Sequence, residues 1–471
     1  MSIKKVLAKV VGIKQTKGPT VFFLYNLKET IKAAAFAGKG ERAYPEIKQG
    51  DIVKIELEEN EAGKYTIKSM EIASKDEKER FNKEENEKLK DVLKISKTYS
   101  KIDEKMLSEF EKMKEILKEL VLNKEGKIYI KHHADIDGYF AAILMDEMLS
   151  NLFEKAGISK EKMIFPLKKP FYDISNAFFD KCCIGKKDLL IILDNGGCEE
   201  DILPLRLLKE NEAKIVVVDH HSSLESWEKR RDEHPADILI LPSENVRDLC
   251  ATALVFELGH YLNLLDEKYL DFVKIAVLAD KCGENVEKRY KINKNERENL
   301  DKKRWRCDFI LFHANSNVYS FLRDVVEKNS FDLLDEEVER KKMEKVEEME
   351  KIAEVVKNDQ ALIYFINLNL LSKGYPPDGR KTGIFFEKVK NKEKKVCVIS
   401  FRDDLMIFRL SDKFEGLKKS KAEEFLKKRE FSNLIAIGGH ENAYSIRFPP
   451  FLKEKLLNIV KRGEWHGGNN N

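Results

Sequence analysis

The sequence predicts an α/β protein in which a small OB-like β-barrel precedes two α/β domains. Five short strand-like runs fall within residues 1–75, as they do in small barrels. Continuous apolar runs at 128–130, 189–193 and 215–218 are typical of strands buried on both faces of a parallel sheet. Residues 346–460 again mix strand-like and helix-like segments, which indicates a second α/β domain.

The composition excludes several classes of protein. Hydrophobic residues make up 42% of the 471 residues, enough for packed cores and too many for a disordered chain. No apolar stretch approaches the roughly 18 residues of a membrane span, so we expect no membrane contact. The seven cysteines form no Cys-x-x-Cys pair, which favours a reducing cytoplasm and argues against a zinc ribbon.

The net charge of +3 conceals local differences, because 86 Lys+Arg stand against 83 Asp+Glu. Residues 1–75 alone carry 14 Lys+Arg and 9 Asp+Glu, a net +5. Their aromatic side chains are candidates for stacking on nucleic-acid bases, although we expect most of them in the barrel core. These side chains are Phe22, Phe23, Tyr25, Phe36, Tyr44 and Tyr65. Binding of a single-stranded nucleic acid is one hypothesis for this domain, and a protein-docking or purely structural role is the other.

Two charged segments are predicted to connect the domains. Residues 76–122 carry an apolar stripe at helical spacing, which we expect to pack on a neighbouring domain rather than in a coiled coil. The stripe consists of Met106, Phe110, Met113, Leu117 and Leu120. Residues 336–356 are predicted to form one long helix. The expected division is therefore 1–75, 76–122, 123–345, 346–460 and a flexible tail at 461–471.

Acidic residues and histidines follow the predicted buried strands. The four segments are 132–138 (HHADIDG), 194–197 (DNGG), 219–221 (DHH) and a helix that ends at Asp280. Each segment alone is more often a turn or a structural histidine. The ordered set would meet at the carboxyl edge of one sheet, where α/β proteins bind ligands. Carboxylates and imidazoles suit Mn²⁺ or Mg²⁺, and two such ions suit a phosphoesterase.

These segments resemble the motifs of a known superfamily. HADIDG, LDNGG, VVDHHSS and VLADKCG look like motifs I to IV of the DHH phosphoesterases. Ser400-Phe-Arg402 and Gly438-Gly439-His440 look like the DHH-associated domain of the RecJ-like branch. The resemblance covers about residues 125–450 and extends to archaeal RecJ-like exonucleases with an OB or S1-like domain in front. It implies a DHH parallel-sheet domain followed by an α/β DHH-associated domain.

The resemblance also implies two divalent ions, Mn²⁺ or Mg²⁺, bridged by Asp194. Asp135 would bind one ion, with His133 as a possible partner. The ligands of the other ion would be Asp137, His220 and Asp280. Lys131 stands where many members of the superfamily have a histidine.

Further roles follow from the same resemblance. Asp219 would orient His220, and His221 would face the scissile phosphate. Arg402 would clamp a phosphate with its planar guanidinium. His440, preceded by Gly438 and Gly439, would contact the substrate backbone. Ile437 replaces the first glycine that the family has there.

The predicted function is a metal-dependent phosphodiesterase, a RecJ-like exonuclease that releases 5′-mononucleotides from single-stranded DNA or RNA. The expected partners are the single strand and replication or repair proteins, and the oligomeric state stays open. A hydrolase of short oligonucleotides or other small phosphoesters is the alternative enzyme. A non-catalytic replication scaffold and an aminoacyl-tRNA editing factor are less favoured, because all the expected metal ligands are present.

Overall fold

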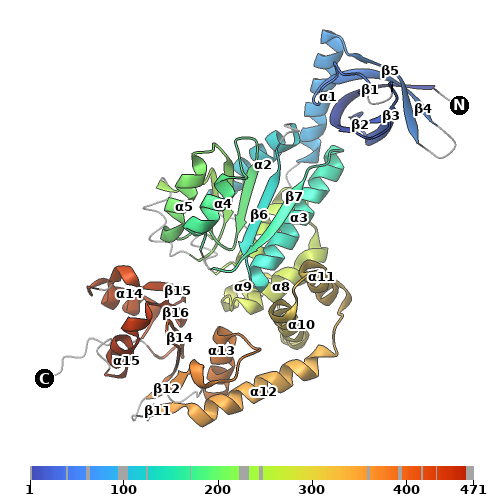
Figure 1. Ribbon diagram of the computed structural model, residues 1–471. Helices are drawn as coiled ribbons and strands as arrows, with labels where there is room; N and C mark the ends of the chain where they lie inside the picture. The colour runs from blue at the N-terminus through green and yellow to red at the C-terminus, as the bar shows by residue number, and fades with distance from the viewer. Residues whose placement is uncertain are drawn as a thin grey trace. The chain divides into compact units, whose positions relative to one another are not determined.

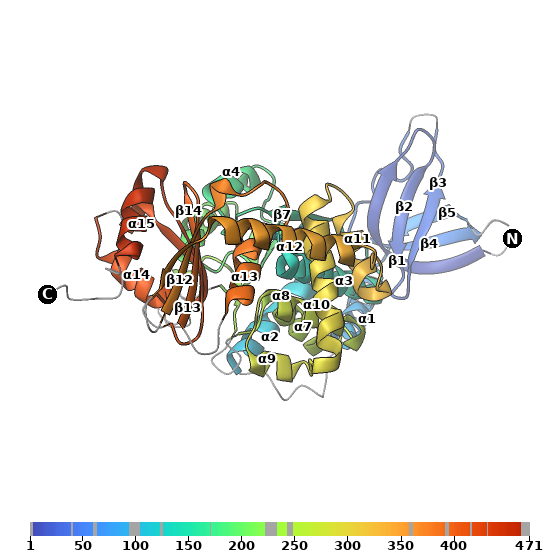
Figure 2. The ribbon, with the colours of Figure 1, turned by 90° about the horizontal axis from the view of Figure 1, so that it is seen from below.

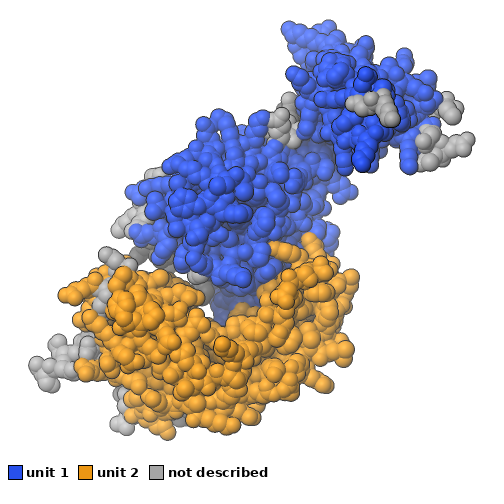
Figure 3. Space-filling view, in the orientation of Figure 1, with its two compact units in different colours: residues 1–300 blue, residues 301–471 orange. Residues whose placement is uncertain are grey.

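The computed structural model divides into two compact units, residues 1–300 and residues 301–471 (Figure 3). The described residues are 3–38, 41–59, 64–93, 104–122, 126–169, 171–221, 233–242, 248–357, 361–390, 395–414, 417–430 and 432–462. The predicted tail lies almost entirely outside these ranges, and the expected division into five parts stays a prediction. Within the described residues, no helix is long and apolar enough to cross a membrane.

The chain begins with a closed five-stranded barrel, in the order β1-β2-β3-β5-β4 (Figure 1). Its strands are β1 (Ile3–Gln15), β2 (Thr20–Tyr25), β3 (Thr30–Ala35), β4 (Ile52–Glu59) and β5 (Tyr65–Ile72). The alternation in β4 buries one face of the strand, so that Val53, Ile55 and Leu57 all belong to the barrel core. The prediction of an OB-like barrel is confirmed.

The aromatic side chains of this domain divide between the barrel core and its surroundings. Phe22 is 0% exposed in the core, and Tyr44 and Tyr65 pack partly buried against it. Tyr25 is buried in a separate cluster with Phe81. Phe36, by contrast, is 68% exposed. Three of the six aromatic residues therefore lie in or against the barrel core, fewer than expected, and Phe36 remains a candidate for base stacking.

Two helices, α1 (Lys75–Val92) and α2 (Glu104–Leu122), follow the barrel. All five residues of the predicted apolar stripe of α2 are buried. The helix packs beside β10 (Ile238–Ile240), and the Phe110 ring lies 5.6 Å from that of Tyr261. The stripe thus covers a neighbouring sheet, as predicted.

The next part of the first unit is a five-stranded parallel sheet in the order β10-β9-β8-β6-β7. Its remaining strands are β6 (Ile128–His133), β7 (Lys162–Leu167), β8 (Leu189–Leu193) and β9 (Lys214–Val218). His132 pairs with Leu193, which pairs in turn with Val218. The three central strands therefore end level with one another, and the segments that follow them emerge at one edge.

Helices cover both faces of this sheet, which explains its continuous apolar strands (Figure 1). The helices on one face are α3 (Ile136–Ala156), α7 (Ala251–Tyr261) and α8 (Leu270–Ala279). The helices on the other face are α4 (Ile174–Lys181) and α5 (Glu199–Lys209). The short helix α9 (Glu284–Arg289) follows α8.

Three helices lead into the second sheet: α10 (Lys294–His313), α11 (Val318–Lys328) and α12 (Leu334–Ile352). The predicted helix over 336–356 is too long at its end, because residues Glu354–Lys357 form strand β11. This segment pairs antiparallel with β12 (Ala361–Asn367), and its two adjacent valines suit a strand.

The second unit contains a six-stranded mixed sheet in the order β11-β12-β13-β14-β16-β15. Its other strands are β13 (Lys395–Phe401), β14 (Leu405–Leu410), β15 (Ala436–His440) and β16 (Ala443–Arg447). Helices α12 and α13 (Asp378–Val389) pack on one face, and α14 (Lys419–Lys427) and α15 (Lys453–Lys461) pack on the other (Figure 2). Strand β15 follows a 3₁₀ turn at Ser432–Leu434.

Candidate metal centre

Two carboxylates are held in fixed positions at the start of α3. Asp135 caps α3, and its Oδ1 accepts a hydrogen bond from the Gly138 N–H at 3.0 Å. A Cβ atom on Gly138 would lie 2.1 Å from the His133 carbonyl oxygen, so no other residue fits there without a shift. Asp137 accepts hydrogen bonds from the N–H groups of Ala251 (2.7 Å) and Thr252 (2.9 Å), at the start of α7. A helix N-terminus stabilises such an anion.

Asp194 follows β8 in a left-handed backbone conformation, with φ of +54°. Its N–H still donates to the Val218 carbonyl at 2.8 Å, so the neighbouring strand fixes the turn. Few residues other than glycine adopt this conformation, and such strain is concentrated at functional sites. The backbone of the same loop is also held at Gly197, whose N–H donates to Asp219 Oδ2 at 2.8 Å. A Cβ atom on Gly197 would lie 2.5 Å from the same oxygen.

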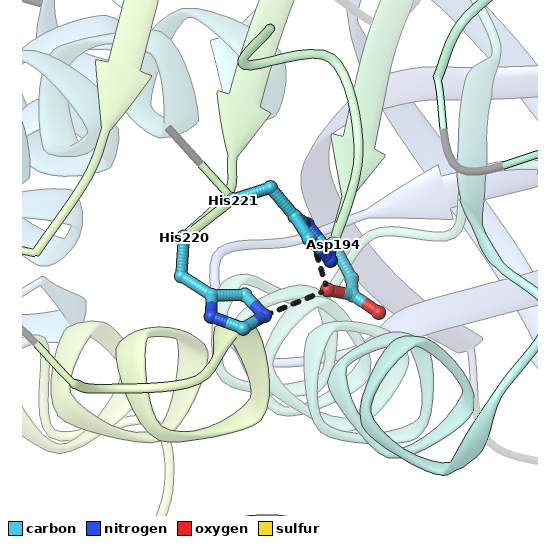
Figure 4. A group of neighbouring side chains, drawn as sticks. All are labelled: Asp194, His220 and His221. Atoms are coloured by element: carbon cyan, nitrogen blue, oxygen red, sulfur yellow. Dashed lines mark hydrogen bonds and ion pairs between the residues drawn. The ribbon is translucent and has the colours of Figure 1, made fainter. Parts of the chain in front are cut away.

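The Asp194 carboxylate lies between histidines from two segments of the chain. Its Oδ1 is 3.2 Å from His220 Nε2 and 3.6 Å from His221 Nδ1 (Figure 4). Its Oδ2 is 3.5 Å from His133 Nδ1. Each carboxylate oxygen therefore faces a different group of ligand atoms, as a bridging carboxylate requires.

The other expected ligands complete two of these groups. His133 Nδ1 lies 3.0 Å from Asp135 Oδ2. His220 Nε2 lies 3.0 Å from Asp280 Oδ2 and 3.6 Å from Asp137 Oδ2. In the described residues three sets of ligand atoms each lie within 4.8 Å of one another and could hold an ion. They are His133–Asp135–Asp194, Asp137–His220–Asp280 and Asp194–His220–His221.

The donor set fits divalent cations. Two buried atoms that face each other, His133 Nδ1 and Asp194 Oδ2, make no hydrogen bond within the described part of the chain. Buried polar atoms are rarely left in this state, and an ion between them would satisfy both. Oxygen and imidazole ligands suit Mn²⁺, or Mg²⁺ where carboxylates dominate.

The carboxylates repel one another strongly in the absence of a cation. Burial, with the charges of Asp194 and Asp280, raises the pKa of Asp137 to about 8. Burial and the charge of Asp135 also raise the pKa of Asp194. A divalent cation supplies the positive charge that keeps such buried carboxylates ionised.

For the neighbouring histidines, the nearby charges outweigh burial and favour the charged form. Burial lowers the pKa of His220, but the Asp280 and Asp194 carboxylates overcome it and place the pKa well above its ordinary value. The pKa of His133 is raised well above its ordinary value in the same way, by Asp135 and Asp194 against burial. The pocket therefore attracts positive charge, from protons or from metal ions.

Asp219 contacts a different ring from the one expected. Its Oδ1 accepts hydrogen bonds from the backbone N–H of His220 (2.7 Å) and from Nδ1 of His221 (2.8 Å). The carboxylate thus positions the His221 imidazole, because the chain turns sharply after β9 and places that ring beside it. The expected role of Asp219 toward the His220 ring stays a prediction.

The histidine pair at the end of β6 divides into two roles. His132 is fully buried, its ring lies 4.5 Å from that of Tyr139, and burial lowers its pKa to about 4. His133 faces the Asp194 carboxylate instead. Lys131, at the position where the family often has histidine, forms a buried ion pair with Asp180 at 2.6 Å. Of these three residues, only His133 joins a group of ligand atoms.

The expected substrate residues all lie in the second unit. Arg402 Nε pairs with Asp404 Oδ1 at 2.9 Å, and its Nη1 lies 3.4 Å from Asp378 Oδ2. Gly438, Gly439 and His440 belong to β15. Gly439 has a φ of +115°, and a Cβ atom there would lie 2.6 Å from the Ala443 carbonyl oxygen.

The strand register separates Arg402 from His440. The Arg402 N–H bonds to the Leu405 carbonyl, at the start of β14. His440 pairs with Ala443, which pairs with Arg409 near the other end of β14. Four residues of strand separate these two levels, or about 13 Å. Arg409 therefore shares a cross-strand row with His440, and Arg402 does not.

The sequence did not reveal the groups that support the centre. The α7 N–H donors to Asp137 carry no side-chain signal at all. Asn195 is fully buried and donates to the Lys169 carbonyl at 3.0 Å, while His234 Nε2 lies 3.0 Å from the Gly196 carbonyl. The two adjacent glycines of the DNGG segment, residues 194–197, were the one sequence signal of this tightly packed loop.

Comparison with known proteins agrees with this geometry. Residues 127–277 match the model described as the DHH family, N-terminal domain, so this part of the chain is a DHH-family domain. An uncharacterized protein of Methanocaldococcus jannaschii is 25% identical over 531 residues, which cover 96% of this chain and 67% of the relative.

The chain was also compared with solved structures. A DHH-domain structure, described as that of a member of a family of ribosomal proteins, has 21% identity and a TM-score of 0.68. It covers 82% of this chain and 98% of its own. RecJ of Thermus thermophilus in complex with Mn²⁺ has 15% identity and a TM-score of 0.45, over 75% of this chain and 54% of that protein. The first likeness establishes the fold.

Proposed function

We propose that this chain is a metal-dependent phosphoesterase that hydrolyses single-stranded DNA or RNA from an end and releases 5′-mononucleotides. The observation that carries the proposal is the position of Asp194, whose two carboxylate oxygens belong to different groups of ligand atoms. A carboxylate shared in this way is what two neighbouring divalent ions need.

Each group of this chain has a defined part in the proposed reaction. When bound, the two ions would activate a water molecule and stabilise the leaving oxygen of a phosphodiester. Asp135 and His133 would hold one ion, and Asp137, His220 and Asp280 the other. The α7 N-terminus keeps the Asp137 carboxylate pointed into the centre.

Asp219 and His221 would act on the substrate side of the centre. Because Asp219 Oδ1 holds Nδ1 of His221 at 2.8 Å, the other ring nitrogen is left for a phosphate oxygen. Burial and the His220 charge lower the pKa of His221, but Asp219 and Asp194 raise it above its ordinary value overall. A protonated imidazole in this position can donate a hydrogen bond to the developing negative charge.

The barrel supports a polymeric substrate. Its segment carries a net +5 over residues 1–75, and Phe36 presents an exposed aromatic ring. Positive charge and exposed rings together suit single strands without sequence preference.

The test is a time course with Mn²⁺ on single-stranded DNA and RNA labelled at either end. Release of mononucleotides from long strands supports the proposal and gives the polarity and sugar preference. Cleavage confined to dinucleotides or other small phosphoesters supports the alternative hydrolase. No cleavage of any substrate by a chain loaded with metal would contradict both enzymatic readings.

A further inference from the structure

Helices α4 and α5 lie side by side on one face of the parallel sheet, and both expose large apolar side chains (Figure 1). The exposed residues are Ile174, Phe178 and Phe179 on α4 and Leu203 on α5. Phe165, on the edge strand β7, is also exposed. The exposed fractions of these five side chains lie between 41% and 68%. We call the five residues the α4–α5 patch.

The patch does not form the contact between the two helices and their sheet. That contact uses Ala177 of α4 and Leu205 and Leu208 of α5, which belong to the buried core. A helix that only covers a sheet has charged or polar residues on its other face. Helix α12 follows this rule, because its exposed Arg340 pairs with Glu337. The outer face of α4 carries isoleucine and phenylalanine instead.

The apolar side chains of α4 and α5 lie at the same level along the two helices. Both helices connect parallel strands of one sheet, so they run in the same direction. Lys181 at the end of α4 pairs with Glu210 just beyond the end of α5. Ile174 and Leu203 each lie about two turns before these paired residues. They are therefore neighbours across the two helices.

The phenylalanine rings extend the patch toward the edge of the sheet. Phe178 lies one turn after Ile174, on the same side of α4. The rings of Phe179 and of Phe165 on β7 each have their centroid 5.8 Å from Lys131 Nζ, so they flank the same buried ammonium group. Residues of α5, α4 and β7 thus form one apolar surface. A contiguous surface of this kind marks an interaction site more often than isolated exposed residues do.

The size of the patch fits a protein–protein interface. The five exposed fractions amount to about 500 Å² of apolar surface, at roughly 200 Å² for each large side chain. A stable interface buries about 800 Å² on each partner, and about 65% of a homodimer interface is apolar. The patch therefore supplies the apolar area that one side of a stable dimer needs.

The charges around the patch favour a second copy of this chain as the partner. Exposed side chains of both signs lie beside it: Lys169 before α4, Glu199 and Glu200 at the start of α5, and Arg206 and Glu210 farther along. A nucleic acid or an anionic membrane would favour positive charge alone. In a two-fold arrangement each surface meets its own copy, so both signs are available on both sides. The net charge of +3 also keeps repulsion between two copies small.

We propose that the α4–α5 patch is the interface of a homodimer, in which α4 and α5 of one chain pack on α4 and α5 of a second copy. Two such layers of paired helices pack through the ridges and grooves of their side chains. Phe178 and Leu203 are the anchors of this interface, one from each helix. The inference is independent of the proposed function, because the patch contains no candidate metal ligand.

Sedimentation velocity of the full chain in EDTA tests the dimer without metal or substrate. Wild type is expected to shift from the mass of one chain to the mass of two as its concentration rises. Phe178→Glu places a charge within the interface, so we expect it to raise the dimer Kd by at least about tenfold. Leu203→Glu is expected to do the same from the second helix. A wild-type chain that stays monomeric at every concentration, or an unchanged Kd in either variant, would overturn the proposal.

Phe451→Glu is the matched control, because Phe451 is an exposed phenylalanine of the second unit and lies outside the patch. Its dimer Kd is expected to equal that of wild type. An equal rise in the Kd of Phe451→Glu would mean that added negative charge alone weakens association, and it would contradict the interface.

The unfolding midpoint of dilute, monomeric protein separates association from folding. Because Phe178 is exposed in the single chain, Phe178→Glu is expected to unfold at the same midpoint as wild type. A lower midpoint would show that the ring packs within its own chain, and the patch would not be a free surface.

Salt distinguishes an apolar interface from one held by charges. Salt screens exposed ion pairs and leaves apolar contacts intact, so we expect the wild-type dimer to persist at high salt. Dissociation of the dimer by salt would assign the association to charge pairs and contradict the α4–α5 patch as its cause.

Discussion

Gly138 stands at a point where a side chain has no room. A Cβ atom there would lie 2.1 Å from the carbonyl oxygen of His133, a backbone atom that cannot move without displacing a candidate ligand. We expect Gly138→Ala to lower the free energy of unfolding by at least about 2 kcal/mol. Urea unfolding of the full chain measures this loss.

Gly18→Ala is the matched control, because the nearest atom to its added Cβ would be 3.9 Å away. The two variants change the same residue type by the same methyl group. If Gly138→Ala proved as stable as Gly18→Ala, the close approach between β6 and the first turn of α3 would be refuted.

Single residues of the candidate site were predictable because they lie directly after strands. Parallel strands that end level with one another bring Asp135, Asp194 and Asp219 to one edge of the sheet. In the sequence, each of these strands is recognisable by its apolar run, and the end of the run marks the end of the strand. The sequence could not show which ring Asp219 contacts. That depends on how two adjacent residues, His220 and His221, turn after the strand.

At the scale of elements, α2 owes its position to its apolar stripe. Phe110 is fully buried at the centre of that stripe, beside Tyr261. We expect Phe110→Ala to cost about 3–5 kcal/mol of unfolding free energy, since it removes a buried aromatic ring. Glu115→Ala on the same helix, at an exposed position, is expected to change it by less than about 0.5 kcal/mol. Similar losses in both variants would contradict the packing of α2 on the sheet.

The contact between α10 and α12 depends on pH. Hydrogen bonds from Arg306 hold the pKa of Asp335 below its ordinary value. Because the folded pKa is the lower one, the stabilisation is fully present above the unfolded pKa of about 4 and is lost as the pH falls through the folded value.

The unfolding free energies of wild type and Asp335→Asn check this sign. We expect wild type to be the more stable at about pH 6 and the difference to shrink toward about pH 3. A difference that stayed constant over this range would show that the ionised Asp335 does not carry the contact.

Elements with strong local patterns were predictable, and those defined by pairing were not. The apolar runs correctly predicted β8 and β9 as buried strands, and the apolar stripe correctly predicted the buried face of α2. The helix expected to reach residue 356 was wrong, because its last residues pair with β12 across the sheet. Similarly, the row that contains Arg409 and His440 depends on the pairing of β14 with the distant strand β16, and no local pattern encodes that pairing.

At the scale of the whole molecule, a basic barrel precedes a metal-binding sheet within one unit. Phe36 is the exposed aromatic ring of that barrel, whereas Phe22 is buried in its core. We expect Phe36→Ala to weaken binding of long single strands by about 1–3 kcal/mol without loss of stability. Fluorescence anisotropy with a labelled oligonucleotide measures the affinity.

The length of the single-stranded nucleic acid provides the control for this prediction. Turnover of very short strands is expected to match wild type in the Phe36→Ala variant, because hydrolysis at the metal centre alone does not require the barrel. Equal losses on short and long strands would argue against a role of the barrel in strand binding and favour a docking or structural module.

The central claim is a pair of metal ions that share Asp194. It is tested most directly by counting the Mn²⁺ ions bound per chain in wild type and in two variants. We predict two ions for wild type, one for Asp280→Asn, and loss of tight binding of both for Asp194→Asn. Asp280 belongs to a single group of ligand atoms, whereas Asp194 belongs to two. Two tightly bound ions in Asp194→Asn, or the same loss in both variants, would contradict the account.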